Sequence, residues 1–66
     1  MAEQIYWLYR DSSPESQAAE DTLKAKGVHP RTIWDAPGYD RFPSLEIGIQ
    51  TFTGLAAIQF YVADRL

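Results

Sequence analysis

Three serines around a single proline are the residues of this chain with the clearest capacity for chemistry. Ser12, Ser13 and Ser16 lie within five positions of one another, beside Pro14 and Glu15. At a helix start, such hydroxyls accept hydrogen bonds from free backbone N–H groups, and Pro14 fits the first turn. A hydroxyl there can also donate to a bound anion at the positive end of the helix dipole. Plain N-capping and anion binding are therefore both open interpretations of these serines.

The chain contains no cysteine. Thiol–disulfide exchange needs a thiolate that attacks a disulfide sulfur, and a serine hydroxyl does not ionise usefully near neutral pH. The absence of cysteine also excludes thiolate metal ligands. His29, the single histidine, precedes Pro30 without clustered carboxylates, so we predict a surface loop residue there and no metal site. We predict no catalytic residue in this chain and no thiol–disulfide oxidoreductase activity.

Length and composition predict one small folded domain over residues 1–66. Hydrophobic residues make up 45% of the chain, which is enough for a core. The formal net charge of −3 argues against nucleic acid and anionic membranes as partners, since both select basic surfaces. No apolar run approaches the roughly 20 residues of a membrane-spanning helix. The first four residues lack the charge and apolar run of a secretory signal, so we expect a cytoplasmic protein.

The serines must be positioned by the elements around them. Residues 5–10 form an aromatic apolar run that predicts a strand, with Trp7 and Tyr9 on one face and Leu8 on the other. A helix is predicted to begin near Ser13 and to close at Gly27. A short second strand follows at 31–34, and short links between these elements imply a parallel β-α-β unit.

The second half of the chain predicts a hairpin and a final helix. Residues 35–41 are predicted to form a loop, and 44–47 and 49–53 to form two antiparallel strands around Gly48. Residues 54–66 have helical spacing, with Phe60 off the apolar stripe. The fold class is therefore α/β, with a four-stranded mixed sheet and two helices on one of its faces. Trp34, Tyr39 or Phe42 could cover the other face.

In its order of motifs the chain resembles the glutaredoxins, within the thioredoxin fold, and the N-terminal domain of glutathione transferases. The segments that carry the resemblance span nearly the whole chain: Ser13-Pro14-Glu15-Ser16 where glutaredoxins have C-P-x-C, then Ala19, Leu23 and Gly27-Val28, later Phe42-Pro43-Ser44-Leu45, and Thr53-Gly54-Leu55 through Tyr61-Val62. The resemblance implies a minimal thioredoxin-like β-α-β-β-β-α domain. Two departures stand out, because both cysteine positions hold serine and the family's middle helix is missing.

The resemblance also implies a ligand site. In that interpretation a serine hydroxyl bonds a thiol, Arg10 holds a carboxylate, and the backbone beside a cis Pro43 pairs with a thiol peptide. The alternatives are a solvated strand end for Arg10 and a simple strand-start proline for Pro43. The hypothetical ligand-binding residues are Arg10, Ser12, Ser13, Ser16, Phe42, Pro43, Thr53 and Gly54.

These observations lead to two hypotheses about function. The first is a redox-inactive glutaredoxin-like domain that acts as a non-catalytic binding or interaction module for an unknown protein or thiol peptide, with a homodimer as an open alternative. The second is a glutathione-binding domain of the transferase N-terminal type, although the 66 residues hold no second helical domain. No cofactor is predicted apart from glutathione in the second hypothesis. The hypothetical interaction surface consists of aromatic residues: Trp34, Tyr39, Phe42 and Phe60.

Overall fold

The computed structural model describes residues 4–66 of the chain. Residues 1–3, part of the segment in which we predicted no secretory signal, lie outside this range. The elements follow the predicted β-α-β-β-β-α order. Their bounds are β1 Tyr6–Arg10, α1 Pro14–Ala25, β2 Arg31–Trp34, β3 Ser44–Ile47, β4 Gln50–Thr53 and α2 Leu55–Arg65. The segment between β2 and β3 contains no helix, so the part of the chain that the structure describes has two helices, as expected.

Local signals explain where α1 begins and ends. Ser13 is the N-cap, and its hydroxyl accepts a hydrogen bond from the Ser16 N–H at 3.2 Å. Pro14 follows at the first helical position, where a missing N–H costs little. At the other end, Gly27 has a φ of 79°, a left-handed conformation that a residue without Cβ adopts readily. The Val28 N–H then bonds the Leu23 carbonyl at 3.0 Å, which closes the helix.

The four strands form one mixed sheet in the order β2-β1-β3-β4. β1 pairs with β2 in parallel and with β3 antiparallel, and β3 and β4 form the predicted hairpin. This confirms the α/β class and the thioredoxin-like layout. Some boundaries were wrong: Ile5 precedes β1, and α2 is one residue shorter at each end than the predicted 54–66. Ile49 lies in the two-residue turn with Gly48, not in a strand, and its side chain is fully exposed.

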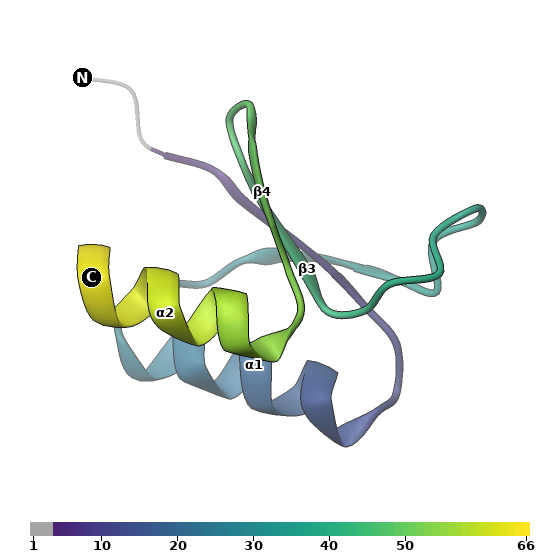
Figure 1. Cartoon of the computed structure of the whole chain (residues 1–66), viewed down its shortest axis with the longest axis horizontal. Coiled ribbons are helices and arrows are strands. Elements are labelled where there is room, and N and C mark those ends of the chain that lie inside the picture. Colours follow the sequence, from purple (N-terminus) through teal and green to yellow (C-terminus); the bar gives the residue numbers. More distant parts are fainter. Residues whose placement is uncertain (1–3) are drawn as a thin grey trace.

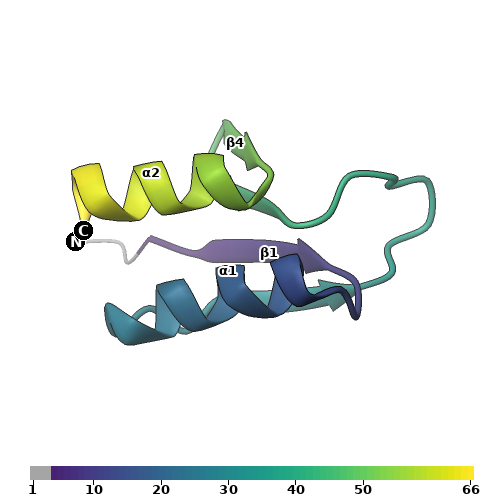
Figure 2. The ribbon, with the colours of Figure 1, turned by 60° about the horizontal axis from the view of Figure 1, so that its bottom comes forward.

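Both helices cover the same face of the sheet. Figure 1 shows α1 and α2 on one side of the strands, and Figure 2 shows them side by side, with α2 towards β4. The hydrophobic core lies between the two layers. Each large side chain buried there contributes roughly 1.5–3 kcal/mol through the hydrophobic effect. The core residues are Leu8, Ala19, Leu23, Leu45, Ile47, Ile58, Tyr61 and Val62.

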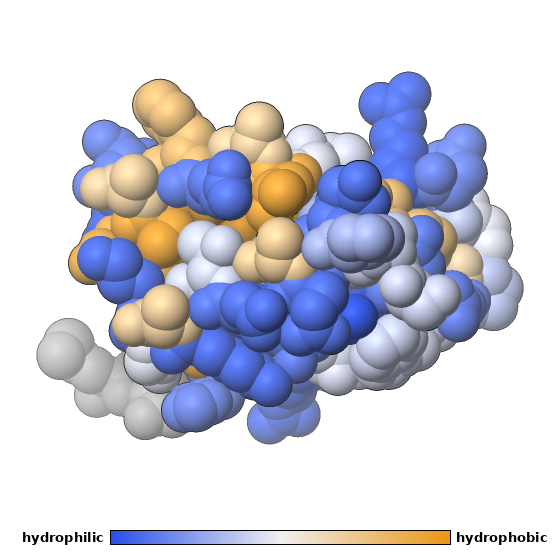
Figure 3. Space-filling view, turned by 90° about the horizontal axis from the view of Figure 1, so that it is seen from below, coloured by the Kyte–Doolittle hydropathy of each residue, from blue (hydrophilic) through white to orange (hydrophobic). Residues whose placement is uncertain are grey.

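The helix side of the molecule carries two kinds of surface. In Figure 3 hydrophobic side chains gather over α2, and hydrophilic ones gather over α1. Phe60 on α2 is 74% exposed, which fits its predicted place off the core-facing stripe. Within residues 4–66, no helix is both long and apolar enough to cross a membrane.

The opposite face of the sheet has no helix over it in the described range. Trp7 and Tyr9 point to this face and are half-buried, while Leu8 between them is fully buried in the core. Tyr39 from the β2–β3 loop stacks on Tyr9, with ring centroids 4.5 Å apart. Trp34 does not cover this face, because it pairs with Arg10 in the sheet register and lies over that arginine on the helix side.

Candidate functional site

Three segments of the predicted ligand site meet at one end of the sheet. The register places Tyr9 of β1 beside Ser44 of β3, and Ser44 beside Thr53 of β4. The chain leaves β1 here towards α1, enters β3 here after Pro43, and leaves β4 here towards α2 (Figure 1). The fold therefore brings the start of α1, residues 42–44 and residues 53–54 to the same end of the molecule.

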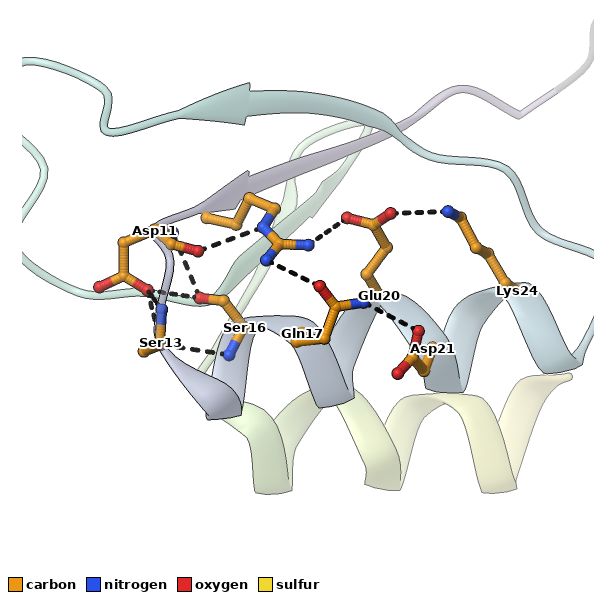
Figure 4. A network of polar contacts seen from close by, with 8 residues as sticks. Asp11, Ser13, Ser16, Gln17, Glu20, Asp21 and Lys24 are labelled. Atoms are coloured by element: carbon orange, nitrogen blue, oxygen red, sulfur yellow. Dashed lines mark hydrogen bonds and ion pairs between the residues drawn. The ribbon is translucent and has the colours of Figure 1, made fainter.

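The Asp11 carboxylate lies at the N-terminal end of α1, next to the N-cap Ser13. Its Oδ1 atom accepts hydrogen bonds from the hydroxyls of Ser13 and Ser16, at 2.6 and 2.8 Å, and from the Ser13 N–H at 3.1 Å (Figure 4). The Ser16 hydroxyl in turn accepts from the Asp11 N–H at 3.3 Å. Hydrogen bonds from Ser13 and then from Ser16 hold the pKa of the Asp11 carboxyl below its usual value.

The two candidate serines are thus engaged by the chain's own carboxylate. Both hydroxyl protons of Ser13 and Ser16 are directed to Asp11, and Ser16 is fully buried. Ser12 is exposed, and Ser13 rather than Ser12 caps the helix. Asp11 was absent from the predicted site. Its signal in the sequence was its place two residues before the N-cap, where an aspartate commonly bonds the following backbone.

Arg10 is not a solvated strand end, and that alternative is wrong. Only 3% of Arg10 is exposed, because the residue lies on the helix side of β1 under the ring of Trp34. The guanidinium carbon of Arg10 lies 3.9 Å from the centre of the Trp34 ring. Its Nη1 forms an ion pair with Glu20, and its Nη2 donates to Gln17 at 3.2 Å. Its Nε donates to the Asp11 carbonyl at 3.2 Å, so four protein groups already surround the guanidinium, which limits its capacity to hold a ligand carboxylate.

Glu20 is the second residue that the sequence reasoning missed. Its carboxylate also pairs with Lys24, one helical turn further on, at 2.7 Å (Figure 4). Hydrogen bonds from Lys24 and, more weakly, from Arg10 lower the pKa of the Glu20 carboxyl against the opposing effect of burial. The spacing of Glu20 and Lys24 is visible in the sequence, but the partner on β1 is not.

The Phe42–Pro43 peptide bond is cis. Pro43 is buried, and its carbonyl accepts a hydrogen bond from the Gly54 N–H at 2.7 Å. Within the described residues, the N–H and C=O of Phe42 have no backbone hydrogen-bond partner. Phe42 therefore has backbone groups that remain open to pairing at this end of the sheet.

The Thr53-Gly54 segment is less available to a ligand than the Phe42 backbone. Gly54 caps α2 without a side-chain hydrogen bond, and its φ of 94° is a conformation that favours glycine. Its N–H donates to the Pro43 carbonyl, so Gly54 offers no free N–H to the ligand site that the resemblance implied. Thr53 Oγ1 lies 3.5 Å from the Ser44 hydroxyl. A hollow of about 200 Å³ opens beside these hydroxyls, lined also by Tyr39 and Arg41.

The four predicted aromatic residues do not form a single surface. Tyr39 and Phe42 lie together, with ring centroids 6.0 Å apart. Trp34 is exposed over Arg10, and Phe60 is exposed on α2. Tyr39 and Phe42 thus extend the open face of the sheet, while Trp34 and Phe60 belong to the helix side.

At the start of α1 the polar groups of Asp11, Ser13 and Ser16 bond one another, so the geometry favours a structural helix cap over a reactive site. All buried side-chain nitrogen and oxygen atoms in residues 4–66 have hydrogen-bond partners. The Ser44 hydroxyl is buried and donates to the Arg41 carbonyl at 2.9 Å, so the groups that remain accessible to a ligand here include the Phe42 backbone and the exposed Thr53 hydroxyl. No protein-family model, curated protein or solved structure matches this chain.

Proposed function

We propose that this chain is a redox-inactive, glutaredoxin-like interaction module that binds an extended segment of a partner protein. The observation that carries the proposal is the closed network at the start of α1, where Ser13 and Ser16 both donate to Asp11. A thiolate held in this place would lie next to a carboxylate, and like charges at such a distance repel. The helix start therefore acts as a structural cap.

The binding site in this proposal is the backbone of Phe42. An extended peptide adds to a sheet by pairing with free N–H and C=O groups, and specificity comes from pockets for alternate side chains. Phe42 supplies free groups of this kind, and its half-buried ring and the more exposed ring of Tyr39 supply apolar contacts beside them. The hollow lined by Ser44 and Thr53 would accept a small polar side chain of the peptide.

The test uses amide shifts of the isotope-labelled chain in two titrations. In the first, reduced glutathione is added, and we expect the amides of Ser13, Ser16 and Gly54 to stay unchanged. In the second, peptides selected from a displayed random library are added, and we expect the amides of Phe42 and Ser44 to move. Gly48 at the opposite end of β3 serves as the internal control and should not move.

Two results would overturn the proposal. Saturable shifts at Ser13 and Gly54 with glutathione would favour the glutathione-binding hypothesis instead. Selected peptides whose shifts map to α2 or to the Gly48 turn would place the binding surface elsewhere.

A further inference from the structure

The uncovered face of the sheet carries an aromatic side chain between two residues of opposite charge. Its central side chain is Trp7, flanked by Arg31 of β2 on one side and Glu46 of β3 on the other. The Arg31 guanidinium carbon lies 5.6 Å from the centre of the Trp7 ring, so both side chains point the same way. Glu46 accepts a hydrogen bond from the Tyr9 hydroxyl at 3.1 Å, which places it on this face as well.

The remainder of this face is largely apolar or neutral. Ile33 and Tyr9 form the next row of the sheet, and Ile5, which precedes β1, is half-exposed. Arg31 and Glu46 are the sole charged residues among the strand positions of this face. The face is therefore electrically neutral overall, although the whole chain carries a net charge of −3.

The arrangement is self-complementary. Neighbouring strands are about 4.8 Å apart, so Arg31 and Glu46 lie at equal distances on either side of Trp7. A two-fold axis parallel to β1 and passing over Trp7 exchanges the two sides. It places Arg31 of each copy opposite Glu46 of the other and brings the two Trp7 rings together. An isologous contact needs this kind of match, because the same patch must complement itself.

We propose that this sheet face is the contact surface of a symmetric homodimer, in which Trp7 packs at the centre and the Arg31 and Glu46 side chains pair across the two-fold axis. Tryptophan, tyrosine and arginine are the residues that most often dominate the energy of a protein interface. The charge pair selects the register of the two sheets, because a shifted copy would place like charges together. The inference rests on Trp7, Arg31 and Glu46 and not on the proposed peptide site, whose hollow lies at the Ser44 end of the same face.

The test is a charge exchange followed by sedimentation velocity over a range of concentrations. Arg31→Glu places a carboxylate opposite Glu46 of the other copy, and Glu46→Arg places a guanidinium opposite Arg31. We expect each single variant to weaken dimerisation at least tenfold. An equimolar mixture of the two variants should dimerise again, because each negative face then meets a positive one, and the double exchange R31E/E46R should restore the homodimer.

Lys26→Glu is the matched control, since Lys26 is exposed at the end of α1 and the charge change equals that of R31E. It should leave dimerisation unchanged. Circular dichroism checks that each variant folds, and E46K replaces E46R if the latter does not. A wild-type chain that stays monomeric at about 1 mM would overturn the proposal. Single variants that dimerise like the wild type, or a mixture that fails to recover, would overturn it too.

Discussion

At the scale of single residues, Asp11 decides the chemistry of the helix start. It accepts three hydrogen bonds through one carboxylate oxygen, from two hydroxyls and one backbone N–H. A ligand anion at the same place would have to displace it. The serines with the clearest capacity for chemistry in the sequence are therefore donors to an internal acceptor, and this arrangement predicts how a thiol would behave in their place.

The pKa of the thiol in Ser13→Cys should be higher with Asp11 present than without it. The Asp11 carboxylate disfavours the neighbouring thiolate, so we expect the pKa to fall by about one unit or more when Asp11→Asn is added to Ser13→Cys. The rate of alkylation as a function of pH measures both values. Equal pKa values in the two variants would show that Asp11 does not control this position.

Asp11 should also make stability depend on pH. Its pKa is lowered in the folded chain, so its contribution is complete above the unfolded value of about 3.9 and is lost as the pH falls through the folded value. We expect the free energy of unfolding of the wild type to exceed that of Asp11→Asn at pH 6, with the difference closing below about pH 4. Urea unfolding at several pH values measures this. A difference that is constant with pH would contradict the proposed network.

At the scale of elements, the ion pair between Arg10 and Glu20 joins β1 to α1. Arg10 is almost completely buried and Glu20 is 13% exposed, so neither charge is well solvated. Lys24 extends the pair towards solvent and is 52% exposed. Loss of Glu20 would leave a buried guanidinium without its carboxylate, whereas loss of Lys24 would remove only an exposed partner.

Glu20→Ala should therefore destabilise the domain by about 3 kcal/mol, the scale for breaking a buried ion pair. Lys24→Ala, the matched control, should cost less than about 1 kcal/mol. Denaturant unfolding measures both changes. For a domain of this size a loss of about 3 kcal/mol is a large part of the total free energy of unfolding. Circular dichroism is therefore needed as a control that the variant is folded in water. Equal effects of the two substitutions would mean that Arg10 is not held by Glu20.

At the scale of the whole molecule, the domain is a two-layer structure with its sheet covered on one face. β1 and β3 are the inner strands, and β2 and β4 form the edges. No helix of the described residues covers the other face, so Trp7, Ile33 and Tyr9 lie on a face that only the β2–β3 loop partly shields.

Native-state hydrogen exchange should follow this architecture. We expect the hydrogen-bonded amides of β1 and β3 to exchange only through global unfolding, because both strands are paired on each side. Amides on the outer sides of β2 and β4 should exchange with a much lower opening free energy. Strong protection along the outer side of β2 or β4 would mean that this edge is covered in solution, and would place the contact between copies there instead of on the sheet face.

The sequence by itself determined the elements and their order, because local signals specify them. An apolar aromatic run predicts β1, Ser13 and Pro14 begin α1, and Gly27 ends it. The tertiary structure alone decided that Arg10 is buried against Glu20, that Asp11 takes the protons of both serines, and that one sheet face stays open. Those outcomes depend on which side chains, distant in the sequence, the packed layers bring together, and no local sequence pattern specifies those contacts.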